Sequence, residues 1–144
     1  MEGYLRLLEK QVDKNRQIHA FAKRQRDAIA AGDMGIVMES DCMRRQIIAQ
    51  LQLLQLEMDS YLKRLPDELQ NLSDHLRDQI VAVSSELKGV IDEIIAIDLE
   101  NAIKLRSLRE ALGERIEEVG KGKKALHGYK NSPRRSSKLF HGAV

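Results

Sequence analysis

The feature that most constrains this 144-residue chain is one long helical pattern, which runs from Pro66 to Val119. Up to Ile97 its apolar residues recur at steps of three and four, the spacing of one buried helix face. Pro66 suits a first helical turn, and the acids at 67 and 68 suit the positive end of the helix dipole. An unbroken helix of this length would extend for roughly 80 Å, at ~1.5 Å per residue.

Two shorter helical patterns precede it, over residues 2–31 and 34–65. Gly32 between them suits the left-handed position that ends a helix, and Asp33 suits the cap of the next one. Because so short a link turns the chain back on itself, the two helices should be antiparallel. We therefore predict an all-α antiparallel bundle of three long helices, with breaks near 32–33 and 65–66. The third helix should extend beyond its partners and present an apolar stripe.

The stripes of the two shorter segments differ in polarity. Asn15, His19 and Arg26 fall on or beside the stripe of residues 2–31, so we expect this helix to pack at an edge. The stripe of residues 34–65 is wider, which is typical of a helix with two neighbours. The sequence therefore places the second helix in the middle of the bundle.

The C-terminal 25 residues have a different composition from the rest of the chain. Residues 120–144 carry seven Lys and Arg and no acid, which leaves residues 1–119 net acidic. Gly120 and Gly122 are expected to end the regular pattern, and the Ser and Pro residues that follow predict a mobile tail. We predict a helical bundle domain over 1–119 and a basic C-terminal tail over 120–144.

No residue pattern in the chain points to an enzyme. The four histidines and the single cysteine, Cys42, have no partners at the spacing of a zinc site. Gly120-Lys-Gly122 lacks the preceding strand and following hydroxyl residue of a phosphate loop. No serine or cysteine lies in a nucleophile motif. We expect no catalytic site, no metal and no cofactor.

The sequence constrains the cellular location and the binding partners of the protein less than it constrains the fold. Charges from Glu2 onward interrupt any signal-peptide core, and no apolar run approaches the ~20 residues that cross a bilayer. We expect a cytoplasmic protein without a transmembrane segment. The basic tail lacks the interleaved aromatic residues of a single-strand binder, so nucleic acid is not the expected partner.

Two passages resemble the flagellar type III export chaperones, most closely the FlgN type, with the FliT type next. Residues 26–57 look like that family's first hairpin, in which Leu- and Glu-rich helices meet at a short Gly-Asp link. Residues 94–129 look like its last long helix. That passage has an acidic-Asn element at Asp98, Glu100 and Asn101, then Leu and Ile steps, then a Gly/Lys stretch and a Tyr.

The resemblance implies a cytoplasmic chaperone without ATPase activity. It would keep the terminal helices of hook-filament junction proteins, or of the filament cap, unassembled for secretion. In the family the C-terminal helical segment binds this substrate, and a C-terminal Tyr docks on the export gate; here Tyr129 matches that Tyr. The positions that match the partner-binding segment are Ile97, Asn101, Ile103, Leu105, Leu108, Leu112 and Ile116.

Two other classes of function remain open on the residues alone. A structural coiled-coil protein would self-associate, for example as a homodimer, through the same stripe of the third helix. Polar gaps such as Asn101 make this alternative weaker, because strict heptads are typical of such proteins. A binder of nucleic acid or of a membrane surface would instead use the basic tail, in a salt-dependent way.

Overall fold

A computed structural model describes residues 2–64 and 72–130 of the chain. The described residues form three helices and no strand, so the predicted all-α class is confirmed. The helices are α1, Glu2–Ala31; α2, Met34–Arg64; and α3, Asp74–Lys130.

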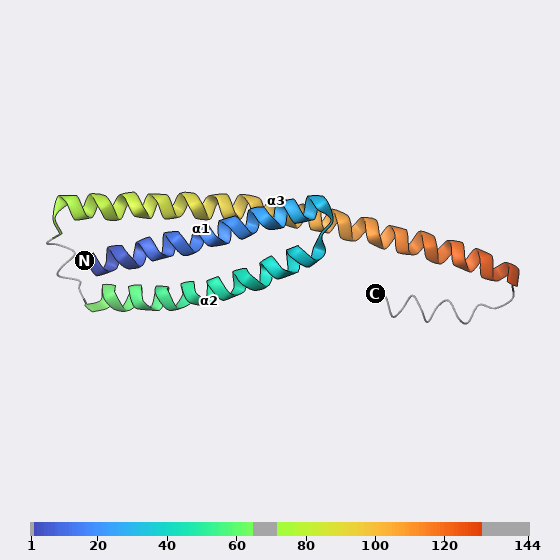
Figure 1. The fold of residues 1–144 in the computed structure, drawn as a ribbon, viewed down its shortest axis with the longest axis horizontal. Helices are drawn as coiled ribbons and strands as arrows, with labels where there is room; N and C mark the ends of the chain where they lie inside the picture. The colour runs from blue at the N-terminus through green and yellow to red at the C-terminus, as the bar shows by residue number, and fades with distance from the viewer. Residues whose placement is uncertain (1, 65–71, 131–144) are drawn as a thin grey trace. The chain divides into compact units, whose positions relative to one another are not determined.

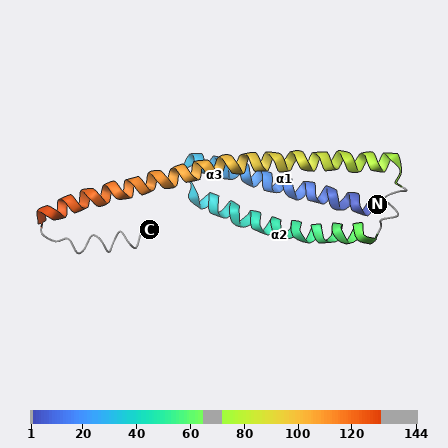
Figure 2. The same cartoon turned by 180° about the vertical axis from the view of Figure 1, so that it is seen from behind.

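The chain divides into two compact units, Met1–Ala102 and Ile103–Val144. We call them unit 1 and unit 2, and α3 contributes residues to both. In unit 1, α2 runs antiparallel to both α1 and α3, as predicted for a three-helix bundle (Figures 1 and 2). The predicted boundary between residues 119 and 120 stays a prediction, and the tail from 131 onward lies outside the described residues.

The link between α1 and α2 has the predicted capping chemistry. Gly32 has a φ of 74°, and its N–H donates to the carbonyl of Ile29 at 3.1 Å. The N–H of Asp33 reaches back to the carbonyl of Ala28 at 2.8 Å, which completes a Schellman motif. The Asp33 carboxylate then accepts from the N–H of Ile36 at 3.2 Å and caps α2. Two residues therefore end one helix and begin the next.

The predicted start of the third helix at Pro66 is not observed. Pro66 itself lies outside the described residues, but Leu72 and Ser73 are described and are not helical. The Ser73 hydroxyl accepts from the N–H of Leu76 at 3.2 Å, and its carbonyl accepts from the N–H of Arg77 at 3.0 Å. Ser73 is therefore the N-cap of α3, and this cap was the sequence signal for the start of the helix.

The predicted end of the helical pattern at Val119 is also wrong, because α3 continues to Lys130. Gly120 and Gly122 lie inside the helix. A glycine costs a helix about 1 kcal/mol relative to alanine, which weakens the helix without ending it. Gly32, by contrast, ends α1 because it adopts a positive φ, which no other described glycine does.

The core of unit 1 takes residues from all three helices. One cluster joins Leu7 and Leu8 of α1 to Met58 of α2, and Ile80 and Val83 of α3 pack against it. A second cluster consists of Ile18, Ile47 and Ile94, one residue from each helix. Each Å² of apolar surface that these contacts remove from water stabilises the fold by about 25 cal/mol.

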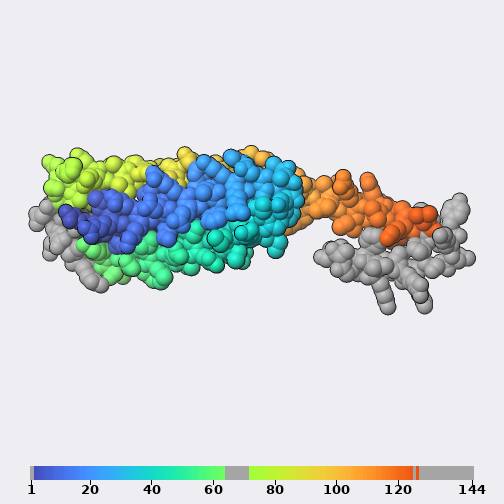
Figure 3. Space-filling model, in the orientation of Figure 1, coloured from blue at the N-terminus to red at the C-terminus, as the bar shows by residue number. Residues whose placement is uncertain are grey.

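The predicted order of the helices needs correction. α1 buries the most residues of the three helices, and Figure 3 shows it between α2 and α3 on one face of unit 1. The buried residues of α1 include two glutamines: Gln11 donates to Gln55 of α2 at 3.0 Å, and Gln25 donates to the carbonyl of Val37 at 3.2 Å. These two glutamines therefore make bonds across the bundle. Of the polar residues named from the sequence, His19 lies with Nε2 3.2 Å from Oε2 of Glu93 on α3, whereas Asn15 and Arg26 bond within α1.

We predict that Gly32→Ala destabilises the bundle by about 1–2 kcal/mol, because an L side chain is strained at a positive φ. No neighbouring atom lies within 4 Å of an added Cβ, so backbone strain is the only cost. Urea unfolding followed by circular dichroism measures the change. Gly32→Asn is the matched control and should lose less, since asparagine tolerates the left-handed region. Equal stability of parent and Gly32→Ala would contradict this account.

Candidate functional site

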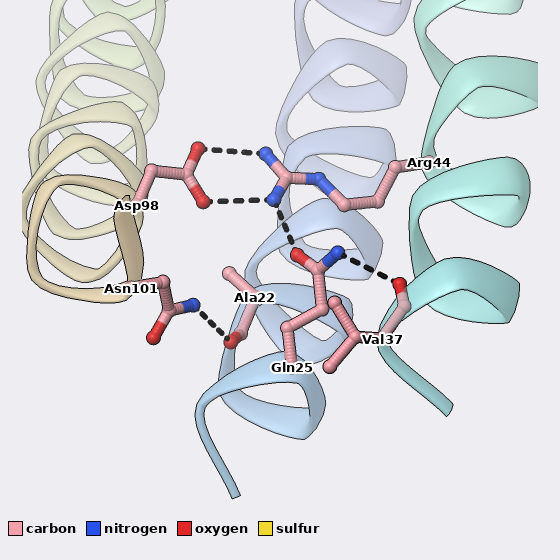
Figure 4. Close-up of polar contacts among 6 residues, drawn as sticks. All are labelled: Ala22, Gln25, Val37, Arg44, Asp98 and Asn101. Carbon is pink, nitrogen blue, oxygen red and sulfur yellow. Dashed lines mark hydrogen bonds and ion pairs between the residues drawn. The ribbon is translucent and has the colours of Figure 1, made fainter. Parts of the chain in front are cut away.

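A cluster of polar side chains joins the three helices close to the end of unit 1. Arg44 of α2 donates from Nη1 and Nη2 to the two carboxylate oxygens of Asp98 on α3, both at 2.7 Å (Figure 4). Nη1 also donates to Oε1 of Gln25 on α1 at 2.8 Å. Because Gln25 also bonds the Val37 carbonyl, these side chains fix α3 in one register against α1 and α2.

The guanidinium of Arg44 is largely buried, and Asp98 is about 38% exposed. The hydrogen bonds that Arg44 donates to Asp98 raise the pKa of Arg44 above its ordinary value. Desolvation by burial lowers the pKa of Arg44, whereas the negative charges of Asp98 and Asp41 raise it further. The guanidinium therefore stays charged, and the two-pronged contact with Asp98 is a charge-assisted pair.

Asn101 extends this cluster by one helical turn of α3. Its side-chain amide donates to the carbonyl of Ala22 on α1 at 3.2 Å, and the residue is buried (Figure 4). Its Oδ1 atom has no hydrogen-bond partner among the described residues. A partner helix cannot contact Asn101 while the bundle is closed, so the structure gives this residue a role inside the bundle.

Beyond Asn101 an apolar row continues along α3. We call it the distal row: Leu105, Leu108, Leu112, Ile116 and Val119. The steps from Ile94 through Ile97 and Asn101 into this row are all threes and fours. By helical periodicity the distal row therefore continues the face that packs inside unit 1. In the distal row Leu105 is half-buried, whereas the other four are exposed, Leu112 to 58%.

The remaining predicted partner-binding residues lie elsewhere on α3. Ile97 is half-buried and belongs to unit 1, at the edge of its packed face. Ile103 is exposed in unit 2. Because it precedes Leu105 by two residues, it lies on the far side of the helix from the distal row. The predicted set therefore does not form one face. At about 100° of helix rotation per residue, Ile103 points away from the other predicted partner-binding residues.

Tyr129, the predicted export-gate residue, belongs to α3, but its side chain lies outside the described part of the structure.

The described residues also bear on metal binding and membranes. None of their His, Cys, Asp and Glu side chains form a group of three or more that could hold a metal ion. No helix among them has both the length and the hydropathy needed to cross a membrane.

The rim of the distal row is basic. Arg109 and Arg115 are exposed and lie on either side of the row, each within about 65° of its centre by helical periodicity. The acids Glu110, Glu114 and Glu117 occupy the opposite side of the helix. An apolar row between two arginines matches a helix with an apolar face and acidic flanks.

Comparison with known proteins adds no further constraint, since no protein-family model, no curated protein and no solved structure matches this chain.

We predict that the Arg44–Asp98 pair stabilises unit 1 more than a neighbouring exposed pair does. Asp98→Asn should lower the free energy of unfolding by about 1–2 kcal/mol, because it removes a charge partner from a largely buried cation. A double-mutant cycle with Arg44→Met isolates the pair. The matched control is Arg45→Met, which removes the exposed pair with Asp41 and should change stability by less than about 0.5 kcal/mol.

The pH dependence of this pair has a definite sign. Because the pKa of Arg44 is raised in the folded protein, the stabilisation by Arg44 is complete at any pH below the ordinary pKa of an arginine and is lost only as the pH rises through the higher folded-state pKa. The coupling energy of the cycle should therefore be equal at about pH 7 and about pH 10. A coupling that falls between these two values, or Arg45 and Arg44 variants of equal stability, would count against the assignment.

Proposed function

We propose that this protein is a non-enzymatic chaperone that binds an amphipathic helix of a partner protein along the distal row. One observation carries the proposal. The apolar face that holds unit 1 together continues in register into unit 2 as exposed leucine, isoleucine and valine side chains. Exposed apolar surface of this kind usually marks an interaction site.

The length and spacing of the row suit a helix better than an extended peptide. Five apolar residues over 15 positions cover about 20 Å of helix, roughly four turns. Leu105, Leu112 and Val119 recur every seven residues, and Leu126 continues the same interval. This is the repeat with which one helix meets another. The arginines on the rim favour a partner with acidic flanks.

The finer proposal is an export chaperone of the FlgN type that acts in the cytoplasm. It rests on the resemblance of residues 26–57 and 94–129 to that family. The substrate would be the terminal helix of a hook-filament junction protein, or of the filament cap. Tyr129 would dock on the export gate. Two features agree with this assignment: the Gly32-Asp33 link joins two antiparallel helices, and the exposed row lies in the last long helix.

We predict that Leu108→Asp combined with Leu112→Asp weakens partner-helix binding by about a hundredfold or more, since each leucine would otherwise be buried on binding. Calorimetry measures the affinity for synthetic terminal helices of a junction protein and of a cap protein. The bundle should remain folded, because both positions lie in unit 2. Ile103→Asp is the control: Ile103 is about as exposed as Leu112 but lies on the other side of α3, so this variant should bind the partner helix like the parent.

The outcomes separate the broad proposal from the fine one. A third peptide, an unrelated amphipathic helix with acidic flanks, completes the experiment. If it binds and both flagellar helices do not, the flagellar assignment is wrong and helix binding stands. If the double variant binds all three as tightly as the parent, the distal row is not the site. If the parent self-associates and the double variant does not, the rival reading as a self-associating coiled-coil protein is correct.

A further inference from the structure

A second face of α3 is exposed along unit 1. We call it the outer face: Val81, Ser85, Lys88, Asp92, Ile95 and Leu99. Its three large apolar side chains are 59–64% exposed. The residues of α3 that pack in the two core clusters, such as Val83 and Val90, lie on the other side of the helix. Figures 1 and 2 agree, since α1 and α2 lie on one side of α3.

The spacing of the outer face is that of a coiled-coil seam. From Val81 to Leu99 its residues follow one another at steps of four, three, four, three and four. Steps that alternate between three and four match the a and d positions of a heptad, and here three of the six positions are apolar and three are polar.

The seam complements itself when two copies run antiparallel. With the two-fold axis at the level of Val90, Val81 of one copy faces Leu99 of the second copy. On the same alignment Ser85 faces Ile95, so a small side chain lies opposite a large one. Both pairs join a d position to an a position, as antiparallel helix pairs do. Because the dimer is two-fold symmetric, each of these residue pairs occurs twice in the interface.

The charges in the seam select this arrangement. Lys88 of each copy faces Asp92 of the second copy in the antiparallel alignment, which gives two opposite-charge pairs. A parallel pair would instead place Lys88 against Lys88 and Asp92 against Asp92. Like charges in register are destabilising, whereas opposite charges attract. The complementarity of size and the complementarity of charge therefore require the same alignment.

One edge of the seam is lined with small residues at the same interval. Ala82, Gly89 and Ala96 are seven residues apart and exposed, so two helix backbones can approach closely along this edge. An added Cβ on Gly89 would meet no atom of its own chain within 4 Å. Packing inside the chain therefore does not require the glycine, whereas the approach of a second helix would use the space.

We propose that two copies of this protein associate through the outer face of α3, in antiparallel orientation. Lys88 of each copy pairs with Asp92 of the other. The inference stands apart from the proposed function, because the outer face belongs to unit 1 and shares no residue with the distal row of unit 2.

Charge reversal tests the proposal directly. Sedimentation equilibrium of the full chain should show a dimer that dissociates on dilution. Lys88→Asp and Asp92→Lys each place like charges opposite one another at two symmetric points, so each should raise the dimer dissociation constant by about tenfold. An equimolar mixture of the two single variants should associate as tightly as the parent, since opposite charges then meet again. The double variant, with both reversals, should also regain the parent's affinity.

Controls separate this face from others. Leu53 of α2 is as exposed as the apolar residues of the outer face, and Leu53→Asp should leave dimerisation unchanged. Leu108→Asp with Leu112→Asp should also leave it unchanged, because the distal row is not in the interface. Circular dichroism verifies that each variant is folded. The proposal is overturned if the parent is monomeric at every concentration, if the single variants associate like the parent, or if their mixture fails to recover.

Discussion

The structure depends on one apolar face of α3, whose residues recur at steps of three and four from Leu76 to Val119. In unit 1 this face is covered by α1 and α2 and supplies Ile80, Val83 and Ile94 to the two core clusters. In unit 2 the same periodicity continues, but the side chains of the distal row are exposed, apart from the half-buried Leu105. One face therefore does two things: its first part stabilises the bundle by burial, and its second part is offered to a partner.

The polar cluster sets where the first part ends. Arg44 and Asp98 pay a desolvation cost, so their contact adds less to stability than a core of the same size would. What the pair contributes is register, because a slip of α3 by one turn would leave a largely buried cation without its carboxylate. Asn101 adds a bond to the Ala22 carbonyl at the same end.

The link between α1 and α2 was predictable from the sequence because its chemistry is local, whereas the Ser73 cap was missed although it is local too, and features that depend on other helices were not predictable. Gly32-Asp33 was recognised because a positive φ and a side-chain cap need particular residue types. Gly120 misled the prediction because a glycine inside a helix has only a small cost. Gln25 was not singled out from the sequence, since its partners Val37 and Arg44 come from another helix. Ile103 was misplaced for a simpler reason: the apolar residues were grouped along the chain and not around the helix.

The central claim is that the distal row is exposed in the free protein and covered by a partner helix. Amide hydrogen exchange along α3, with and without a bound amphipathic peptide, measures this directly. We expect strong protection over 76–97 in both states, because that segment packs in the bundle. Over 105–119 we expect weak protection in the free protein and a large increase on binding. Strong protection of 105–119 without peptide, or an increase confined to unit 1, would contradict the account.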